Sequence, residues 1–170
     1  MKTQLLILAV ALAALGGCSP AVQTESTYLA EAKKIVHEVT PAEADAELRA
    51  NKDLLLLDVS TWNEYERGHI AGAVIIPRGL LEFKIVKNDL FPTVNRGRSP
   101  RKNQPILLYC KSGGRSVLAA RTLMEMGYSN VRSLKGGLDA WKEAKLPVEA
   151  VAVRPASPAS QPEAATAPAK

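Results

Sequence analysis

The chain has 170 residues, a net charge of +5 at pH 7 and a hydrophobic content of 46%, which suffices for one domain with a buried core. Its only cysteines are Cys18 and Cys110. If Cys18 is modified, as its surroundings indicate, Cys110 is a lone thiol, and this argues against dithiol redox chemistry.

The N-terminus predicts export from the cytoplasm. Residues 1–4 are basic, residues 5–15 form an unbroken apolar run, and small residues precede Cys18. The run is too short to span a bilayer, which takes about 20 residues, but it matches a secretory signal peptide. The predicted signal peptide covers residues 1–17, and a polar tether follows over residues 18–26.

Residues 15–18 (LGGC) resemble the lipobox of bacterial lipoproteins. The resemblance implies lipidation of Cys18 and a membrane anchor, since several acyl chains hold a protein stably. Ser19 after the cysteine favours sorting to the outer membrane, with the domain facing the periplasm. The alternative is an ordinary secreted protein with a free Cys18. For an exported protein no nucleic-acid partner is expected.

The first half of the domain predicts alternating helices and strands. Helical spacing runs from Thr27, a candidate cap, to Val36, and a short strand covers residues 36–39. Thr40 as cap, Pro41 and an acidic first turn start a helix that runs to Ala50. Residues 54–59, 73–76 and 106–109 are apolar runs, with Asp58 as the one charged residue among them, as expected for strands buried on both faces.

The second half continues the alternation. A helix is expected from about Arg115 to a stop at Gly127, then a strand over residues 131–134 and a helix over residues 138–144. Ala, Pro, Ser and Gln dominate residues 151–170, so a disordered tail is predicted there. The alternation predicts one α/β domain over residues 27–150 with a parallel sheet.

The segment over residues 110–116 (CKSGGRS) carries the functional prediction. A strand ends at Cys110, a glycine-rich loop follows, and then a helix begins. Backbone N–H groups and a helix N-terminus stabilise an anion, here the thiolate of Cys110, which is the reactive form of cysteine. Gly113 and Gly114 allow turns that aim N–H groups inward, and Ser112 and Ser116 add hydroxyl donors. The alternative is a buried, inert thiol.

Several short segments resemble a single-domain rhodanese, a sulfurtransferase. They are residues 57–59 (LDV), 64–65 (EY), 68–73 (GHIAGA), 76–77 (IP), 110–116, 134–137 (LKGG) and 140–141 (AW). They occur in family order over residues 36–148. The resemblance implies the rhodanese-like fold, an α/β fold with a five-stranded parallel sheet and helices on both faces.

The length of the loop separates two chemistries. Four residues lie between Cys110 and Arg115, whereas cysteine phosphatases have one more, since a phosphate is larger than a sulfur atom. Ser116 stands where those enzymes have the arginine, and Tyr109 where they usually carry histidine. The loop therefore fits a persulfide sulfur.

The resemblance implies that Cys110 takes a sulfane sulfur from a small anionic donor such as thiosulfate, or from a persulfide. The sulfur then passes to a thiol or to cyanide, by covalent catalysis. No metal or organic cofactor is expected. The donor-binding residues would be Lys111, Ser112, Gly113, Gly114, Arg115 and Ser116. The alternatives are a persulfide carrier that serves a protein sulfur acceptor, or a non-catalytic binding module in the cell envelope.

Three side chains near the predicted site leave their roles open. Asp58 either braces the loop or is purely structural. His69 is interpreted as a structural turn residue, because no second histidine or cysteine stands at metal-ligand spacing. Ser60 occupies the position of a family arginine, and Arg67 or Arg78 are candidate substitutes for it.

Residues 84–102 hold six basic residues and one acidic residue. With Lys111 and Arg115, this run would steer an anionic donor toward Cys110. The alternative, which we favour, is a solvated loop whose charge only aids solubility.

Overall fold

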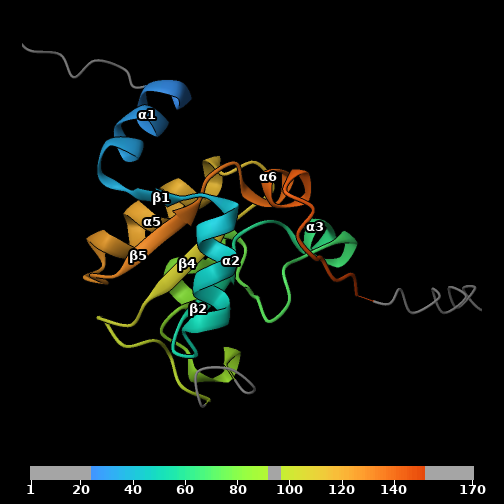
Figure 1. The fold of residues 1–170 in the computed structure, drawn as a ribbon. Helices are drawn as coiled ribbons and strands as arrows, with labels where there is room; N and C mark the ends of the chain where they lie inside the picture. Colours follow the sequence, from blue (N-terminus) through green and yellow to red (C-terminus); the bar gives the residue numbers. More distant parts are fainter. Residues whose placement is uncertain (1–23, 92–96, 152–170) are drawn as a thin grey trace, which may run out of the picture.

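The computed structural model describes residues 24–91 and 97–151 (Figure 1). The signal peptide predicted for residues 1–17, the lipidation of Cys18 and the tail from residue 152 onward lie outside these residues. Within the described ranges, every helix is too short or too polar to cross a membrane.

The centre of the molecule is a parallel five-stranded sheet in the order β1-β5-β4-β2-β3, which confirms the predicted fold class. Its strands are β1 (His37–Val39), β2 (Leu55–Asp58), β3 (Val74–Ile75), β4 (Ile106–Tyr109) and β5 (Val131–Leu134). Both β2 and β4 are buried at every position, as their apolar runs predict. Since all strands run in one direction, their carboxyl ends meet at one edge of the sheet.

Helices cover both faces of the sheet. They are α1 (Glu25–Ile35), α2 (Pro41–Ala50), α3 (Trp62–Arg67), α4 (Leu81–Lys84), α5 (Gly114–Glu125) and α6 (Gly137–Glu143), with 3₁₀ turns over Arg78–Leu80 and Asn88–Leu90. The predicted cap of α2 is present, since the Thr40 and Glu43 side chains accept from each other's backbone N–H groups. The left-handed Gly127 ends α5, as predicted.

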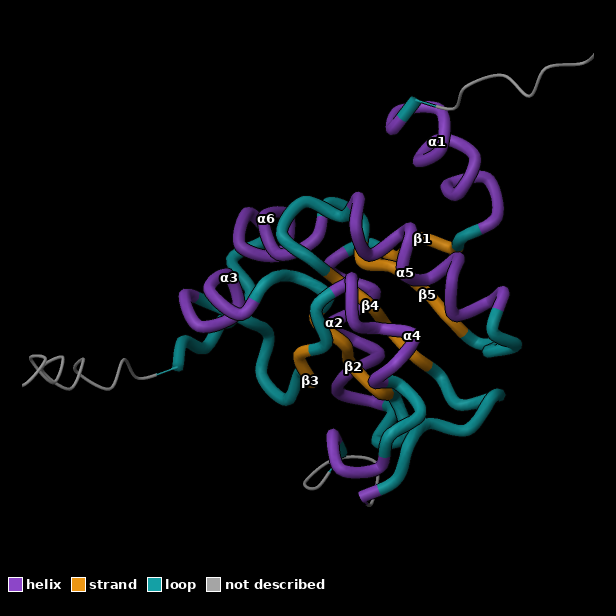
Figure 2. The backbone as a smooth tube through the Cα atoms, turned by 180° about the vertical axis from the view of Figure 1, so that it is seen from behind, coloured by secondary structure: helices purple, strands orange, loops and turns teal. Residues whose placement is uncertain are grey.

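Alternate side chains of each strand enter two separate cores. Leu55 and Leu57 of β2 pack with α1, α4 and α5 on one face of the sheet. Figure 2 is a view from the back of Figure 1 and shows α4 and α5 on this face. Leu56 of β2 points to the other face, where it packs with α2, α3 and α6. Cys110 belongs to the first core and Tyr109 to the second, so the end of β4 is anchored on both sides.

Several local predictions were wrong. The cap of α1 is Thr24 rather than Thr27, so the helix already includes part of the predicted tether. The third strand is only two residues long and half-buried, because β3 lies at the edge of the sheet with β2 as its sole neighbour. Helices α3 and α4 were not predicted, because they are too short to show a helical period.

The segment after α6 returns to α3. His69 and Glu149 form an isolated antiparallel bridge, and the Val151 N–H donates to the Glu66 carbonyl at 3.1 Å. The described chain therefore ends beside α3.

Candidate active site

Cys110 follows β4 directly and lies at the carboxyl edge of the sheet, where parallel α/β folds bind ligands. The residue is 1% exposed. The Gly113 N–H donates to Cys110 Sγ at 3.2 Å. Gly113 has a φ of 95° and immediately precedes α5, so a left-handed residue makes the turn that aims this N–H at the sulfur. The predicted juxtaposition of thiol, glycine loop and helix start is present.

The start of α6 holds the other side of the loop. The Leu138 N–H donates to the Cys110 carbonyl at 2.8 Å, and the Asp139 N–H donates to the Lys111 carbonyl at 2.9 Å. A Cβ on Gly137 would lie 2.3 Å from the Cys110 oxygen, so only glycine permits this approach. Because these two carbonyls face α6, the sulfur side of the loop is left to N–H groups such as that of Gly113.

Ser116 does not serve as the predicted hydroxyl donor to a ligand. Its side chain is fully buried, and its Oγ donates to the Gly113 carbonyl at 2.9 Å. The Ser133 hydroxyl of β5 donates to Ser116 Oγ, also at 2.9 Å. The single proton of Ser116 is therefore used to fix the loop from behind. Ser112 is exposed at the tip of the loop.

Arg115 is held by Glu64 of α3. Arg115 Nη1 and Nη2 donate to the two Glu64 carboxylate oxygens at 2.7 Å and 2.8 Å. Hydrogen bonds from Arg115, and then those from Thr61, lower the pKa of Glu64 to about 2. The pKa of Arg115 is raised, first by its hydrogen bonds to Glu64 and then by its interaction with Cys110. The pair is therefore ionised and bidentate.

The second cation of the loop also has a carboxylate partner. Lys111 Nζ lies 3.5 Å from Asp139 Oδ2, and about half of each side chain is exposed. This pair is looser than that of Arg115 and Glu64. Each cationic side chain of the loop thus faces one carboxylate, from α6 or from α3.

Asp58 acts behind the site rather than in it. The residue is 1% exposed, and its Oδ1 accepts from the N–H and the hydroxyl of Ser60. Burial raises the pKa of Asp58. Ser60, at the position of the family arginine, is itself buried and occupied by this contact. These bonds favour the structural role for Asp58, although the side chain also lies near Tyr109, the residue before Cys110.

Arg78 does not replace the missing family arginine. Its guanidinium donates to Glu82 and to Thr122, each at 2.8 Å, and Thr122 lies in the second half of α5, away from the loop. His69 has the predicted structural role: its Nδ1 lies 3.0 Å from the Tyr65 carbonyl, and its ring stacks on that of Tyr65.

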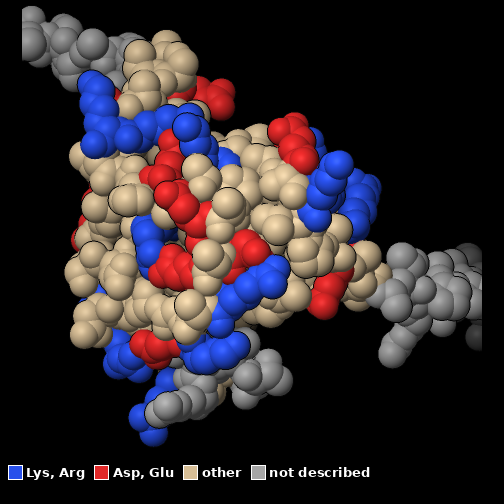
Figure 3. All heavy atoms as spheres, in the orientation of Figure 1, with Lys and Arg blue, Asp and Glu red and all other residues tan. Residues whose placement is uncertain are grey.

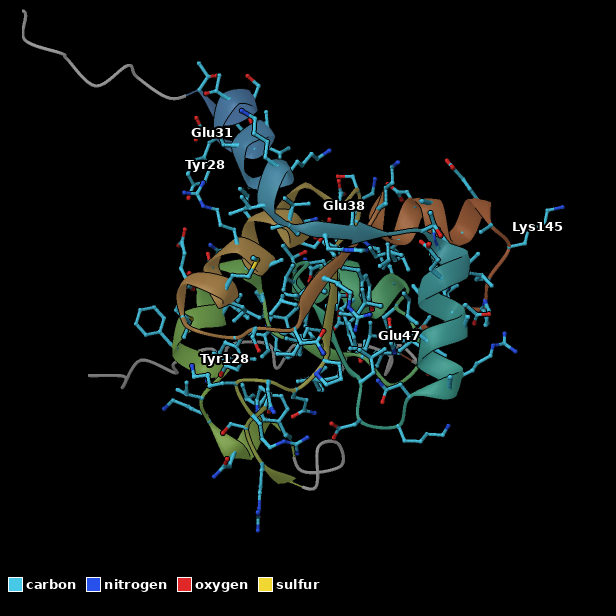
Figure 4. The ribbon with its side chains drawn as sticks, turned by 60° about the vertical axis from the view of Figure 1, so that its left-hand side comes forward. Tyr28, Glu31, Glu38, Glu47, Tyr128 and Lys145 are labelled. Carbon is cyan, nitrogen blue, oxygen red and sulfur yellow. The ribbon has the colours of Figure 1, made fainter. Side chains whose placement is uncertain are left out.

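The last part of the basic run, residues 98–102, lies at the edge of the sheet opposite to Cys110. Arg101 binds Asp53 before β2 at 2.7 Å. Lys102 Nζ donates to the Met126 carbonyl at 2.7 Å and lies over the Tyr128 ring, after the end of α5. Figure 4 shows Tyr128 far from the end of α6, marked by Lys145. The length of α5, about 18 Å, therefore separates these charges from Cys110.

Charges of both signs are mixed over the face shown in Figure 3. A cavity of about 610 Å³ lies at the same edge as Arg101, lined by that residue, Arg98, Gln104 and the start of β2. It lies away from Cys110. Within residues 24–91 and 97–151, no His, Cys, Asp and Glu side chains are grouped closely enough to hold a metal ion.

Three contributors to the site were missed from sequence. Glu64 stands in a Thr-x-x-Glu capping box with Thr61, and that pattern was a usable signal for α3. Gly137 stands in a family motif, but no residue next to it in the sequence indicates that it touches the loop. Ser133 gave no signal, because its partner Ser116 lies on another element.

Comparison with known proteins agrees with this fold. Residues 40–144 match the family model described as a rhodanese-like domain. A sulfurtransferase from Allochromatium vinosum is 31% identical over 116 residues, covering 68% of this chain and 97% of the relative. The thiosulfate sulfurtransferase GlpE of Coxiella burnetii is 33% identical over 96 residues, covering 56% and 78%.

Among solved structures, one from Rhodopseudomonas palustris shares 30% sequence identity and a TM-score of 0.64, covering 77% of this chain and 98% of that one. That protein is described as of unknown function and a possible tyrosine phosphatase.

Proposed function

The chain belongs to the rhodanese-like family of sulfurtransferases, and from that premise we propose that it transfers a sulfane sulfur through a persulfide on Cys110. The observation that carries the proposal is the hydrogen bond from the Gly113 N–H to Cys110 Sγ at 3.2 Å, in a loop whose first two carbonyls are bound by α6. An N–H group aimed at this position stabilises a negative sulfur before and after transfer.

The proposed reaction has two halves. The Cys110 thiolate attacks the sulfane sulfur of the donor, a bond forms between Sγ and that sulfur, and the bond to the leaving group breaks. The leaving group departs with the electron pair, as sulfite from thiosulfate or as a thiolate from a persulfide. An acceptor thiolate or cyanide then attacks the outer sulfur, and the electrons of the broken bond return to Cys110 as a thiolate.

A phosphatase reaction is less well supported. The R. palustris neighbour is described as a possible tyrosine phosphatase, but the loop here has only four residues between Cys110 and Arg115. Arg115 also gives two of its donors to Glu64. We expect no hydrolysis of p-nitrophenyl phosphate.

The test is mass spectrometry of the purified protein after exposure to thiosulfate or to a small alkyl persulfide. We expect Cys110 to gain the mass of one sulfur atom with at least one donor, and Cys110→Ala to gain none. Addition of cyanide or a thiol should remove the added mass. A protein that gains no sulfur from either donor would contradict the proposal and favour a non-catalytic binding module.

Turnover separates an enzyme from a carrier. Repeated conversion of donor in the presence of excess thiol is expected for an enzyme. A carrier that serves a protein acceptor would load Cys110 once and release the sulfur only to that partner.

We further propose that residues 1–17 are a lipoprotein signal and that lipidated Cys18 anchors the domain to the outer membrane, facing the periplasm. The basis is the lipobox-like sequence alone. Cys18→Ala is expected to release the protein from the membrane fraction of a bacterial host. Unchanged fractionation of the variant would contradict the anchor.

A further inference from the structure

We infer that the loop of this protein selects a carbon-borne persulfide over thiosulfate as sulfur donor, and that Glu64 is the residue that sets this preference. The inference rests on the proposed sulfur transfer and narrows the donor class. The observation behind it is that both cations of the loop, Lys111 and Arg115, already face carboxylates.

The two donor classes differ in what lies beyond the transferred sulfur. With that sulfur against Cys110 Sγ, thiosulfate places an anionic sulfonate at the rim of the loop. A persulfide on carbon places an uncharged methylene group there. The charge of the rim therefore discriminates between the donors, while the N–H groups around the sulfur serve both equally.

Glu64 neutralises the charge of Arg115. The carboxylate takes two hydrogen bonds from Arg115, and its Oε2 also accepts from the Thr61 N–H at 2.9 Å and the Thr61 hydroxyl at 2.8 Å. Because it is held by α3 as well as by Arg115, Glu64 cannot move aside without breaking the cap of that helix. A sulfonate near Arg115 meets this fixed negative charge.

Asp139 has the same effect on Lys111, but more weakly. The two charged atoms are 3.5 Å apart, and both side chains are about half exposed. Solvent screens such a pair, so its influence on donor choice is smaller. The cationic side chains of the loop and their two partners thus sum to zero charge at the rim.

The favoured step balances without a further reactant. The Cys110 thiolate and R–S–SH give Cys110–S–SH and R–S⁻: one sulfur–sulfur bond forms at Sγ, the one in the donor breaks, and the electron pair leaves with the R-bearing sulfur.

The experiment measures the second-order rate of sulfur loading on Cys110, by quenched mass spectrometry, with thiosulfate and with the persulfide of 2-mercaptoethanol. Glu64→Gln removes the charge of Glu64 but keeps a side chain that can complete the capping box. Glu66→Gln is the matched control, because it removes the same charge from an exposed position of the same short helix. Circular dichroism verifies folding.

In the wild type we expect faster loading from the alkyl persulfide. Glu64→Gln should raise the thiosulfate rate roughly tenfold, more at low salt than at high salt, and leave the persulfide rate within about twofold. Glu66→Gln should leave both rates near wild type. If Glu64→Gln does not fold, Asp139→Asn gives the same test with a smaller expected gain.

Faster loading of the wild type from thiosulfate would overturn the inference while leaving sulfur transfer intact. Equal gains for both donors, or equal gains in Glu64→Gln and Glu66→Gln, would also overturn it. Absence of loading from both donors would instead refute the proposed function itself, so the two failures are distinguishable.

Discussion

Basic side chains have different partners at the two edges of the sheet, the edge where the strands begin and the edge where they end. At the edge where β2 and β4 begin, Arg101 and Lys102 fasten the loop before β4 to Asp53 and to the end of α5. At the edge where these strands end, Arg115 and Lys111 surround a buried thiol, and each is matched by a carboxylate from another element. Arg101 and Lys102, which end the basic run, are thus at the opposite edge from Cys110. The sulfur of Cys110 accepts a hydrogen bond from the Gly113 N–H, while both cationic side chains of the loop are paired with carboxylates.

The strongest test of the difference between the two edges is to make a glycine-to-alanine substitution at each of them. Gly137→Ala adds a Cβ that would lie 2.3 Å from the Cys110 oxygen and 2.8 Å from the Gly113 nitrogen. Its left-handed φ alone costs about 1–2 kcal/mol in an alanine, and the overlap adds to this. Since the overlap displaces the loop, we expect sulfur loading to fall by about tenfold or more.

Gly127→Ala is the control at the opposite edge. Gly127 also has a left-handed φ, but a Cβ there meets no atom within 4 Å. This variant should lose about 1 kcal/mol of unfolding free energy and keep its loading rate. Chemical denaturation and loading kinetics check both variants. Equal rates in the two would show that α6 does not hold the loop.

The Arg115–Glu64 pair predicts a specific pH dependence. The pKa of Glu64 is lowered from 4.5 to about 2, chiefly by hydrogen bonds from Arg115. Because the pKa of Glu64 is lower in the folded state, its carboxylate stabilises the fold at any pH above the pKa of the unfolded state. This contribution is lost as the pH falls toward the pKa of the folded state. The difference in unfolding free energy between wild type and Glu64→Gln should thus be constant from about pH 8 to about pH 5 and narrow below about 4.5.

Denaturant titrations at successive pH values measure this difference. Narrowing that already began near neutral pH would contradict a strongly held ion pair.

The smallest effect is expected at the opposite edge. Arg101→Gln removes one exposed ion pair with Asp53, which contributes about 0–1 kcal/mol. Because Arg101 lies at the start of β4, loading from either donor should change by less than about twofold, and its salt dependence should stay the same. A marked loss of loading from thiosulfate would restore the steering interpretation of residues 84–102.

What the sequence predicted well was local. Apolar runs indicated β2, β4 and β5. Thr40 marked the start of α2 and Gly127 the end of α5, each to within a few residues. The loop around Cys110 was also predicted, because its strand, glycines and helix are contiguous. Such signals need no knowledge of what packs against them.

The features that the sequence did not predict depend on contacts between segments that are distant in the chain. Glu64 and Arg115 are 51 residues apart, and Ser116 and Ser133 are 17 apart. The donor role expected of Ser116 was wrong because β5 occupies the space behind it. For Arg101 and Lys102 the structure favours the alternative to steering, because these residues precede β4 whereas Cys110 follows it.

The bonds from Leu138 and Asp139 to the carbonyls of Cys110 and Lys111 also bear on the order in which the protein is made. While a ribosome is still adding β5, the nascent polypeptide already contains Cys110 but lacks the amides that hold the loop after it. The geometry of the candidate site is thus completed late in translation, with nearly the whole domain synthesised.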